Sequence, residues 1–188
     1  MDNAKKIHIE PREVLRIGGI LMAICASVAL VLSFVNMVTR DKIAQNNEAE
    51  KRNAIVALFE EGIEYTELEG APETVNGVYK VTLGEETLGY CISVSPSGFG
   101  GNIDMMVALD GTSTVLGVKI VSLSETPGLG SRVAEEAFLS AFEGKGSGIT
   151  LGDIDAISGS TISSRAVLSG VNAATAALTE YLGGGVSN

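Results

Sequence analysis

The stretch IDMMVALDGTSTVLGVKIVSLS (residues 103–124) carries the clearest structural signal in the chain. Two strand-like runs, IDMMVALD and TVLGVKIVSLS, flank the dipeptide Asp110-Gly111, which is typical of a tight β-hairpin turn. In the second run, Leu116, Val118 and Ile120 are expected on one face, because side chains alternate between the two faces of a strand. The stretch therefore predicts an antiparallel hairpin.

The segments on either side extend this pattern. Before it, VYKVTLG (78–84) and LGYCISVSPSG (88–98) alternate as strands do, and the GEET between them predicts a second hairpin. After it, SRVAEEAFLSAFEG (131–144) predicts one amphipathic helix with a serine cap and a closing glycine. Its expected apolar stripe is Val133, Ala137, Phe138 and Ala141. A last helix is predicted at about 162–182, and the order of elements indicates an α+β domain with an antiparallel sheet and flanking helices.

An apolar run without charged residues lies between Arg16 and Arg40. As a helix, residues 17–38 would be about 33 Å long, enough to cross a hydrocarbon core of about 30 Å. The alternative, a signal peptide, would have an apolar region of about 7–15 residues and an A-x-A-like cleavage site. The longer run without such a site predicts an uncleaved anchor. The expected parts are an N-terminus at 1–16, a transmembrane helix at 17–38, a connecting helix at 39–62 and a folded domain at 63–188.

The charge distribution restricts the class of partner. The chain has 13 Lys and Arg against 23 Asp and Glu, which gives a net charge of −10, and most of this charge follows the apolar run. Such acidity argues against nucleic acid or an anionic membrane face as a partner. Lys and Arg are balanced between the two flanks of the run, so the positive-inside rule does not assign its orientation.

The few cysteine and histidine residues exclude several chemistries. Cys25 lies in the apolar run and Cys91 in a strand-like run, so we expect no disulfide between them. No CxxC cluster is present in the sequence for zinc or an iron–sulfur centre, and no metal site is expected. The one histidine, His8, precedes the apolar run, which excludes a Ser-His-Asp triad in the folded domain.

A cluster of hydroxyl side chains marks the predicted start of the last helix. The segment DAISGSTISS (155–164) contains Ser158, Ser160, Thr161, Ser163 and Ser164. The first amides of a helix are unbonded and carry partial positive charge, so this segment is suited to bind a phosphate group. The alternative is an ordinary cap by Ser158 or Thr161 with the other hydroxyls solvated. A Walker A loop is excluded, because the sequence has no G-K-[ST] here.

Two glycine-containing loops add to this signal. The segment SLSETPGLGSR (122–132) joins a strand to a helix, and its proline and two glycines predict a shaped loop with exposed amides and a carboxylate at Glu125. The segment SGFGGNIDMMVALD (97–110) offers a place where a flat group can approach the backbone. Each loop has an ordinary alternative, a strand-to-helix connection for the first and a hairpin corner for the second.

Taken together, the motifs resemble a known family. SETPGLG (124–130), GFGGNIDMMVALD (98–110) and DAISGST (155–161), behind one apolar span, are similar to those of the FMN-binding G subunit of Rnf ion-translocating electron-transport complexes. The same domain occurs in the C subunit of the sodium-pumping NADH:quinone reductase. The resemblance covers nearly the whole chain from the apolar span onward.

One motif of this family carries the cofactor. It reads D-x-x-[ST]-G-A-T, and FMN is joined through its phosphate to the hydroxyl of the final threonine. The chain matches it at Asp155, Ser158, Gly159 and Thr161, and has Ser160 where alanine is usual. The resemblance therefore implies covalent FMN in a phosphoester bond to Thr161, made by a separate flavin transferase.

The resemblance implies a cofactor site from two segments. The expected FMN contacts are Thr161, Asp155, Ser158, Gly159, Ser160, Ile162, Ser163, Glu125, Thr126, Pro127, Gly128, Leu129 and Gly130. The loop 125–130 is expected to pack beside the flavin ring. No catalytic residue is expected in the protein itself, because the flavin carries the redox chemistry.

The implied function is that of a membrane-anchored electron-transfer subunit of an ion-translocating ferredoxin:NAD⁺ oxidoreductase. Expected partners are the membrane and iron–sulfur subunits, a flavin transferase and the membrane. The expected location is the inner (cytoplasmic) membrane, crossed once, with residues 1–16 in the cytoplasm and the FMN domain outside it. The alternatives are the C subunit of the quinone reductase, a stand-alone extracellular flavoprotein, and a cofactor-free membrane-anchored binding or scaffold domain.

Overall fold

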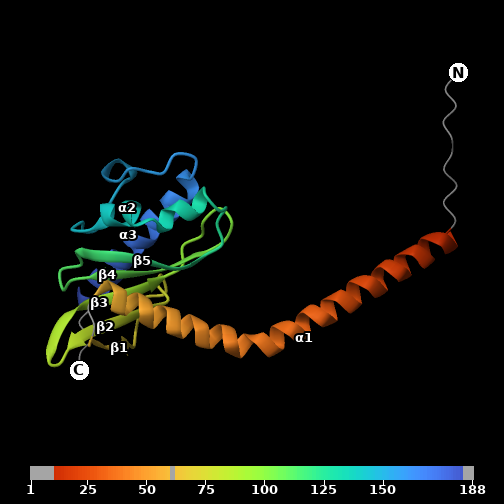
Figure 1. Cartoon of the computed structure of the whole chain (residues 1–188), viewed down its shortest axis with the longest axis horizontal. Coiled ribbons are helices and arrows are strands. Elements are labelled where there is room, and N and C mark those ends of the chain that lie inside the picture. The colour runs from red at the N-terminus through yellow and green to blue at the C-terminus, as the bar shows by residue number, and fades with distance from the viewer. Residues whose placement is uncertain (1–10, 60–61, 184–188) are drawn as a thin grey trace, which may run out of the picture. The chain divides into compact units, whose positions relative to one another are not determined.

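The first element that the structure describes is a long helix, α1 (Pro11–Leu58), which is followed along the chain by a sheet and shorter helices (Figure 1). The computed structural model describes residues 11–59 and 62–183. The chain divides into two compact units, Met1–Asn47 and Glu48–Asn188. The helix α1 runs through this boundary, so its last residues belong to the second unit.

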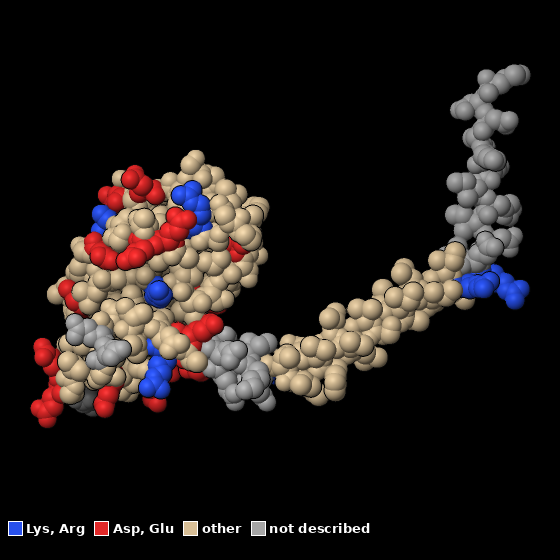
Figure 2. Space-filling view, in the orientation of Figure 1, with Lys and Arg blue, Asp and Glu red and all other residues tan. Residues whose placement is uncertain are grey.

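In the first unit, α1 has the length and composition of a membrane span. The stretch Leu15–Arg40 has 26 residues and a mean hydropathy of 2.4, and its side chains are exposed. At 1.5 Å per residue it is about 39 Å long, which exceeds a hydrocarbon core of about 30 Å. Figure 2 shows Lys and Arg at the start of the described helix and no charged side chain along the middle of this stretch.

The second unit is built on a five-stranded antiparallel sheet with the order β1-β2-β3-β4-β5. The strands are β1 (Glu64–Leu68), β2 (Gly77–Leu83), β3 (Glu86–Val94), β4 (Ile103–Leu109) and β5 (Val115–Leu123). Each strand pairs with its neighbour in sequence. Both predicted hairpins and the α+β class with an antiparallel sheet are therefore confirmed.

The sequence pattern did not predict β1. Its sequence, EYTEL, shows no alternation of apolar and polar residues, and most of its side chains are exposed. The strand is defined by its antiparallel backbone pairing with β2. Tyr65 also packs edge to face on Tyr79 with the ring centroids 6.2 Å apart. The glutamates of this edge strand disfavour pairing with another chain.

One face of the sheet packs against the C-terminal helix, α3 (Thr161–Gly183), which is confirmed where the sequence predicted it. Strand residues such as Ile92 and Val107 point to this face and are fully buried. The helix meets them with side chains at helical spacing, namely Val167, Val171, Ala174 and Leu178. This layer forms the larger part of the hydrophobic core.

The opposite face of the sheet packs against the end of α1. Ala54 and Ile55 are buried there, in one cluster with Val81, Cys91 and Met106. Burial raises the pKa of the Cys91 thiol to about 12, so the thiol stays neutral at pH 7. The last turns of α1 are therefore part of the core of the second unit.

The single helix predicted for residues 131–144 is wrong. The segment forms three short turns: η1 (Gly130–Ala134), α2 (Glu136–Leu139) and η2 (Ser140–Phe142). The backbone is extended at Glu135, with φ −68° and ψ 135°. Val133 and Phe138 are both buried, yet on a continuous helix they would point about 140° apart at about 100° per residue. The break at Glu135 allows both side chains to face the core.

Two details of that prediction also change. Ser131 does not cap a helix, because its Oγ accepts a hydrogen bond from the backbone N–H of Gly128 at 2.9 Å. Ala137 is exposed, whereas Leu139 and Phe142 are buried. The apolar stripe is therefore set by the short turns and not by the spacing of one helix.

The shared face predicted for Leu116, Val118 and Ile120 is correct only for the last two. A β-bulge opposite Leu109 inserts Leu116 as an extra residue in β5. Beyond the bulge Val115 takes the core position with 1% of its surface exposed, while Leu116 is 43% exposed. The bulge reverses the alternation that the sequence suggested.

Candidate functional site

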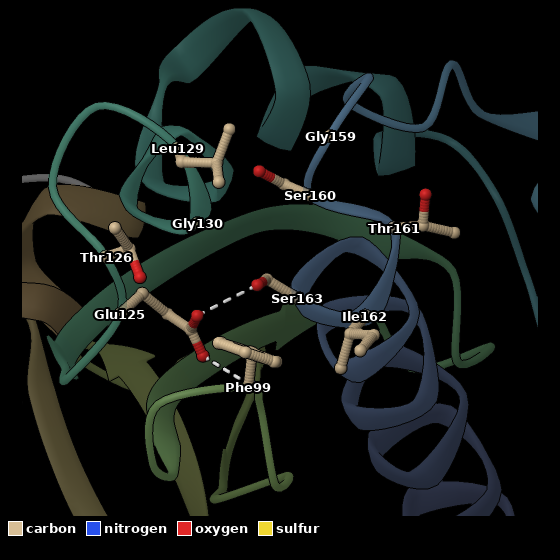
Figure 3. A pocket seen from close by; sticks show the side chains of 10 residues that line it. All are labelled: Phe99, Glu125, Thr126, Leu129, Gly130, Gly159, Ser160, Thr161, Ile162 and Ser163. Atoms are coloured by element: carbon tan, nitrogen blue, oxygen red, sulfur yellow. Dashed lines mark hydrogen bonds between the residues drawn. The ribbon is translucent and has the colours of Figure 1, made fainter.

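Three segments that are distant in sequence meet around one cavity of about 280 Å³ (Figure 3). They are the turn between β3 and β4, the loop that follows β5, and the start of α3. The lining residues are Phe99, Glu125, Thr126, Leu129, Gly130, Gly159, Ser160, Thr161, Ile162 and Ser163. All except Phe99 belong to the cofactor contacts expected from the sequence.

The carboxylate of Glu125 joins these three segments, and only 8% of the residue is exposed. Its Oε1 accepts hydrogen bonds from the backbone N–H of Phe99 at 2.7 Å and of Gly100 at 3.2 Å. Its Oε2 accepts a hydrogen bond from Ser163 Oγ at 3.0 Å, at the first turn of α3 (Figure 3). The sequence predicted a loop carboxylate at this position, and the structure shows a buried carboxylate bonded on both oxygens.

Glycines around Glu125 make room for its carboxylate. A Cβ on Gly98 would overlap Oε1, and a Cβ on Gly130 would overlap Oε2. A Cβ on Gly100 would overlap the carbonyl oxygen of Ser124. The glycines of the two predicted loops are therefore required by close packing at these three positions. This differs from the backbone freedom that the sequence suggested for Gly130.

Two other glycines are required by their backbone angles. Gly128 has φ +73° and Gly159 has φ +81°, in the left-handed region that other residues disfavour. A Cβ on Gly159 would also lie 3.1 Å from Cδ1 of Leu129, so the leucine packs close to this backbone. Pro127 and Gly128 shape the loop but do not line the cavity, although the structure describes both.

Helix α3 begins at Thr161, at the edge of the cavity. Thr161 is exposed, and Ile162 is 53% exposed (Figure 3). Neither Ser158 nor Thr161 is the cap that the sequence suggested as an alternative, because Ser160 directly precedes the helix. The Ser160 side chain is buried, and its Oγ has no hydrogen-bond partner among the described residues. The hydroxyl that reaches solvent at the helix start is therefore that of Thr161.

Asp155 and Ser158, the first two matched positions of the motif, do not line the cavity. Both are exposed. Asp155 lines a separate depression beside Phe138 and Lys145. The structure thus brings residues 159–163 to the cavity and leaves the start of the motif outside it.

Phe99 is the lining residue that sequence reasoning did not single out. Its side chain is 70% exposed, which is unusual for a large aromatic residue, while its backbone N–H is held by Glu125. The surrounding glycines drew attention to this turn, but no local pattern indicated that it lies against the start of α3. Its assignment required the tertiary contacts.

The lining combines apolar and polar halves. Phe99, Leu129 and Ile162 come from three different segments and leave large apolar surfaces exposed around the cavity, as suits a flat ring. The start of α3 contributes hydroxyls and the positive end of a helix, as suits an anion. Among the described residues that line the cavity, Glu125 carries the one formal charge. A ligand with a flat apolar ring and an anionic group would satisfy both halves.

Comparison with known proteins identifies the family. Residues 98–176 match the family described as FMN-binding domain, and this range includes every lining residue. The G subunit of the Na(+)-translocating ferredoxin:NAD(+) oxidoreductase complex of Acetobacterium woodii is 30% identical over 92% of this chain and 95% of that protein. The chain belongs to this family of G subunits. The corresponding G subunit of the proton-translocating complex of Clostridium ljungdahlii is 27% identical, over 85% of this chain and 89% of the relative.

A solved structure shows that the fold of this chain also occurs in another protein. The crystal structure of Shewanella oneidensis NqrC superimposes with a TM-score of 0.56 at 18% identity. The alignment covers 76% of this chain and 100% of that chain. The likeness shows that this protein and NqrC share a fold.

The residues of the cavity fit FMN. Its volume of about 280 Å³ lies just below the range of about 300–1,000 Å³ that is typical of small-molecule sites. A cavity of this size encloses part of FMN, and the exposed faces of Phe99 and Ile162 extend the apolar surface beyond it. The unbonded hydroxyl of Ser160 and the exposed hydroxyl of Thr161 stand beside the helix start, where a phosphate is stabilised.

Proposed function

We propose that this protein is a membrane-anchored FMN electron-transfer subunit of an ion-translocating ferredoxin:NAD⁺ oxidoreductase complex. The observation that carries the proposal is the meeting of Phe99, the loop 125–130 and the start of α3 around one cavity. The match to the FMN-binding domain supports the cofactor, and membership of the G-subunit family supports the complex. Near full-length similarity to the G subunits favours this assignment over NqrC, with which the likeness is one of fold.

The second part of the proposal is a phosphoester bond between FMN and Thr161 Oγ1. Its position supports this role, because Thr161 is exposed, lines the cavity and begins α3. The bond leaves a negative charge on the phosphodiester, which the amides and partial positive charge of the helix start stabilise. In this proposal a separate flavin transferase forms the bond, so the protein needs no base of its own.

The protein residues hold and shield the cofactor. FMN supplies the redox chemistry when bound. Phe99, Leu129 and Ile162 provide apolar contacts for the ring and displace water from it. Glu125 acts through its hydrogen bonds, which hold the Phe99 backbone and the Ser163 side chain in place.

The third part of the proposal concerns domains and location. Residues 17–38 cross the inner membrane once, residues 39–62 connect, and residues 63–188 bind FMN on the extracytoplasmic side. The apolar stretch Leu15–Arg40 supports the membrane anchor. Contact with the membrane and iron–sulfur subunits of the complex follows from the proposed place in the electron path.

The test is the mass of the full chain after co-expression with a flavin transferase. Wild-type protein is expected to be yellow and to carry one added FMN phosphoryl mass, which peptide mapping assigns to Thr161. Thr161→Ala should remove this mass while the domain still folds. Thr126→Ala, at another threonine of the lining, is the matched control and should keep the flavin.

The outcomes separate the function from the residue assignment. A colourless wild-type chain without added mass would contradict the FMN function and favour a cofactor-free binding or scaffold domain. A flavin mass on Ser160, Ser163 or Ser164 would leave the function standing and contradict the assignment to Thr161.

A further inference from the structure

The hydroxyl of Ser160 differs from its buried neighbouring hydroxyls in having no bond. Ser160 directly precedes α3, 5% of the residue is exposed, and its Oγ has no hydrogen-bond partner in the described chain. A serine at this position normally accepts a hydrogen bond from an amide of the first helical turn. Here the hydroxyl is buried without that bond, which costs folding free energy.

The adjacent buried serines show that this region satisfies its other hydroxyls. Ser163 Oγ donates to Glu125 Oε2 at 3.0 Å. Ser164 Oγ donates to the carbonyl oxygen of Ser160 at 3.0 Å and accepts from the N–H of Ile157 at 3.2 Å. The missing partner is therefore specific to the side chain of Ser160.

The position of the Ser160 hydroxyl at the cavity indicates that a bound ligand can supply its hydrogen-bond partner. Ser160 lines the cavity, and Figure 3 shows its hydroxyl directed toward the side chain of Leu129. Leu129 is itself a lining residue of the cavity. Rotation of the serine about χ1 is the route by which the hydroxyl reaches a ligand in the cavity.

We propose that Ser160 Oγ donates a hydrogen bond to a phosphate oxygen of FMN bound in this cavity. This inference rests on the proposed function. The hydroxyl and the first amides of α3 are all donors, and a phosphate oxygen is an acceptor that accommodates several of them.

The test compares Ser160→Ala in the flavin-free and flavin-loaded full-length protein, made without and with a flavin transferase. Thermal unfolding in detergent is measured by calorimetry, and the mass of each sample confirms its loading. In the flavin-free protein the Tm should stay unchanged or rise, because the variant removes a hydroxyl that makes no bond. In the loaded protein the Tm should fall, because the bond to phosphate is lost.

Ser164→Ala is the matched control, since Ser164 is a buried and fully bonded serine of the same turn. It should lower the Tm of both forms by the same amount. Ser160→Cys, which keeps nearly the same shape with a weaker donor, should change the two forms in the same directions as alanine but by less. The phosphorus NMR signal of the loaded protein should shift in both Ser160 variants.

Equal changes of Tm in the two forms of Ser160→Ala, or an unmoved phosphorus signal, would overturn the proposed contact. A wild-type chain that carries no flavin after co-expression would overturn the proposed function, and this inference with it. The mass of the wild-type sample therefore separates the two failures.

Discussion

Glu125 places its carboxylate among three donors from two other segments, the N–H groups of Phe99 and Gly100 and the hydroxyl of Ser163. A buried carboxylate left without such donors would be strongly destabilising. Gly98 and Gly130 provide the space that the carboxylate occupies. The Glu125 side chain therefore both holds the cavity together and places a negative charge in its lining.

Glutamine at this position should separate these two roles. In Glu125→Gln the side-chain oxygen can accept from Phe99 and Gly100 and the NH₂ group can donate to Ser163, so stability should change by only about 1 kcal/mol. Loss of the negative charge should raise the reduction potential of the attached flavin by about 30 mV or more, since about 30 mV corresponds to about 1.4 kcal/mol for a two-electron couple. Spectroelectrochemistry and urea unfolding measure the two effects.

Glu125→Ala is the control for the structural role. It leaves the three donors unpaired and should destabilise the domain by about 1–3 kcal/mol or more. If Glu125→Gln kept both the flavin and the fold but left the potential unchanged, the carboxylate would have a structural role alone.

The end of α1 has a structural role in the folded unit in addition to leading into the apolar span. Ala54 and Ile55 are buried against the second face of the sheet, over Val81, Cys91 and Met106. Ile55 is 1% exposed, and burial of such a side chain contributes about 1.5–3 kcal/mol. The helix that leads into the apolar span is therefore also a structural part of the folded unit.

Two fragments test the contribution of this element. Fragment 48–188 should unfold cooperatively in urea, whereas fragment 60–188 should be less stable by at least about 3 kcal/mol, because it lacks the buried residues of α1. Cys91 is the single cysteine in both fragments. It lies on the sheet face that the end of α1 covers, so its reactivity shows whether that face is exposed. Its thiol should resist alkylation in the longer fragment, where burial holds its pKa at about 12, and react in the shorter one.

Ile55→Ala in fragment 48–188 provides an intermediate case and should lower stability by about 2–5 kcal/mol. Equal stability and equal thiol reactivity in the two fragments would show that the sheet does not depend on α1.

Across the whole molecule, charge is divided unevenly along the chain. The residues between Arg16 and Arg40 are uncharged, while acidic residues give the chain its net charge of −10. Figure 2 shows Asp and Glu spread over the visible face of the sheet-containing unit. This acidity keeps the unit solvated and disfavours contact with anionic lipid. The balanced Lys and Arg flanks favour neither orientation by the positive-inside rule.

Sidedness can be measured with one engineered cysteine. Glu85, in the exposed turn between β2 and β3, is replaced by cysteine in a Cys25→Ala background, and the buried Cys91 stays unreactive. An impermeant maleimide should label Glu85→Cys in intact cells. Asp2→Cys is the control and should react only after lysis. The reverse pattern of labelling would place the FMN domain in the cytoplasm and contradict the proposed topology.

The sequence by itself determined the features that depend on local patterns. Asp110-Gly111 between alternating runs predicted one hairpin, and the alternation of residues 78–98 predicted another. Helical spacing in α3 predicted its bounds closely, since apolar residues three and four apart form one buried face. The motifs also named two of the three segments of the cavity, the loop 125–130 and the start of α3, because their glycines and hydroxyls are unusual at any location.

Only the tertiary structure decided the features that depend on distant contacts. Strand β1 is defined by its pairing with β2 and not by its own exposed side chains. The break at Glu135 arises because the core requires both Val133 and Phe138 to face inward. The cavity forms where segments separated by about 25 to 60 residues of sequence come together, and no local pattern encodes such a contact. This contact buries Glu125, places Phe99 in the lining and leaves the hydroxyl of Ser160 without a partner among the described residues.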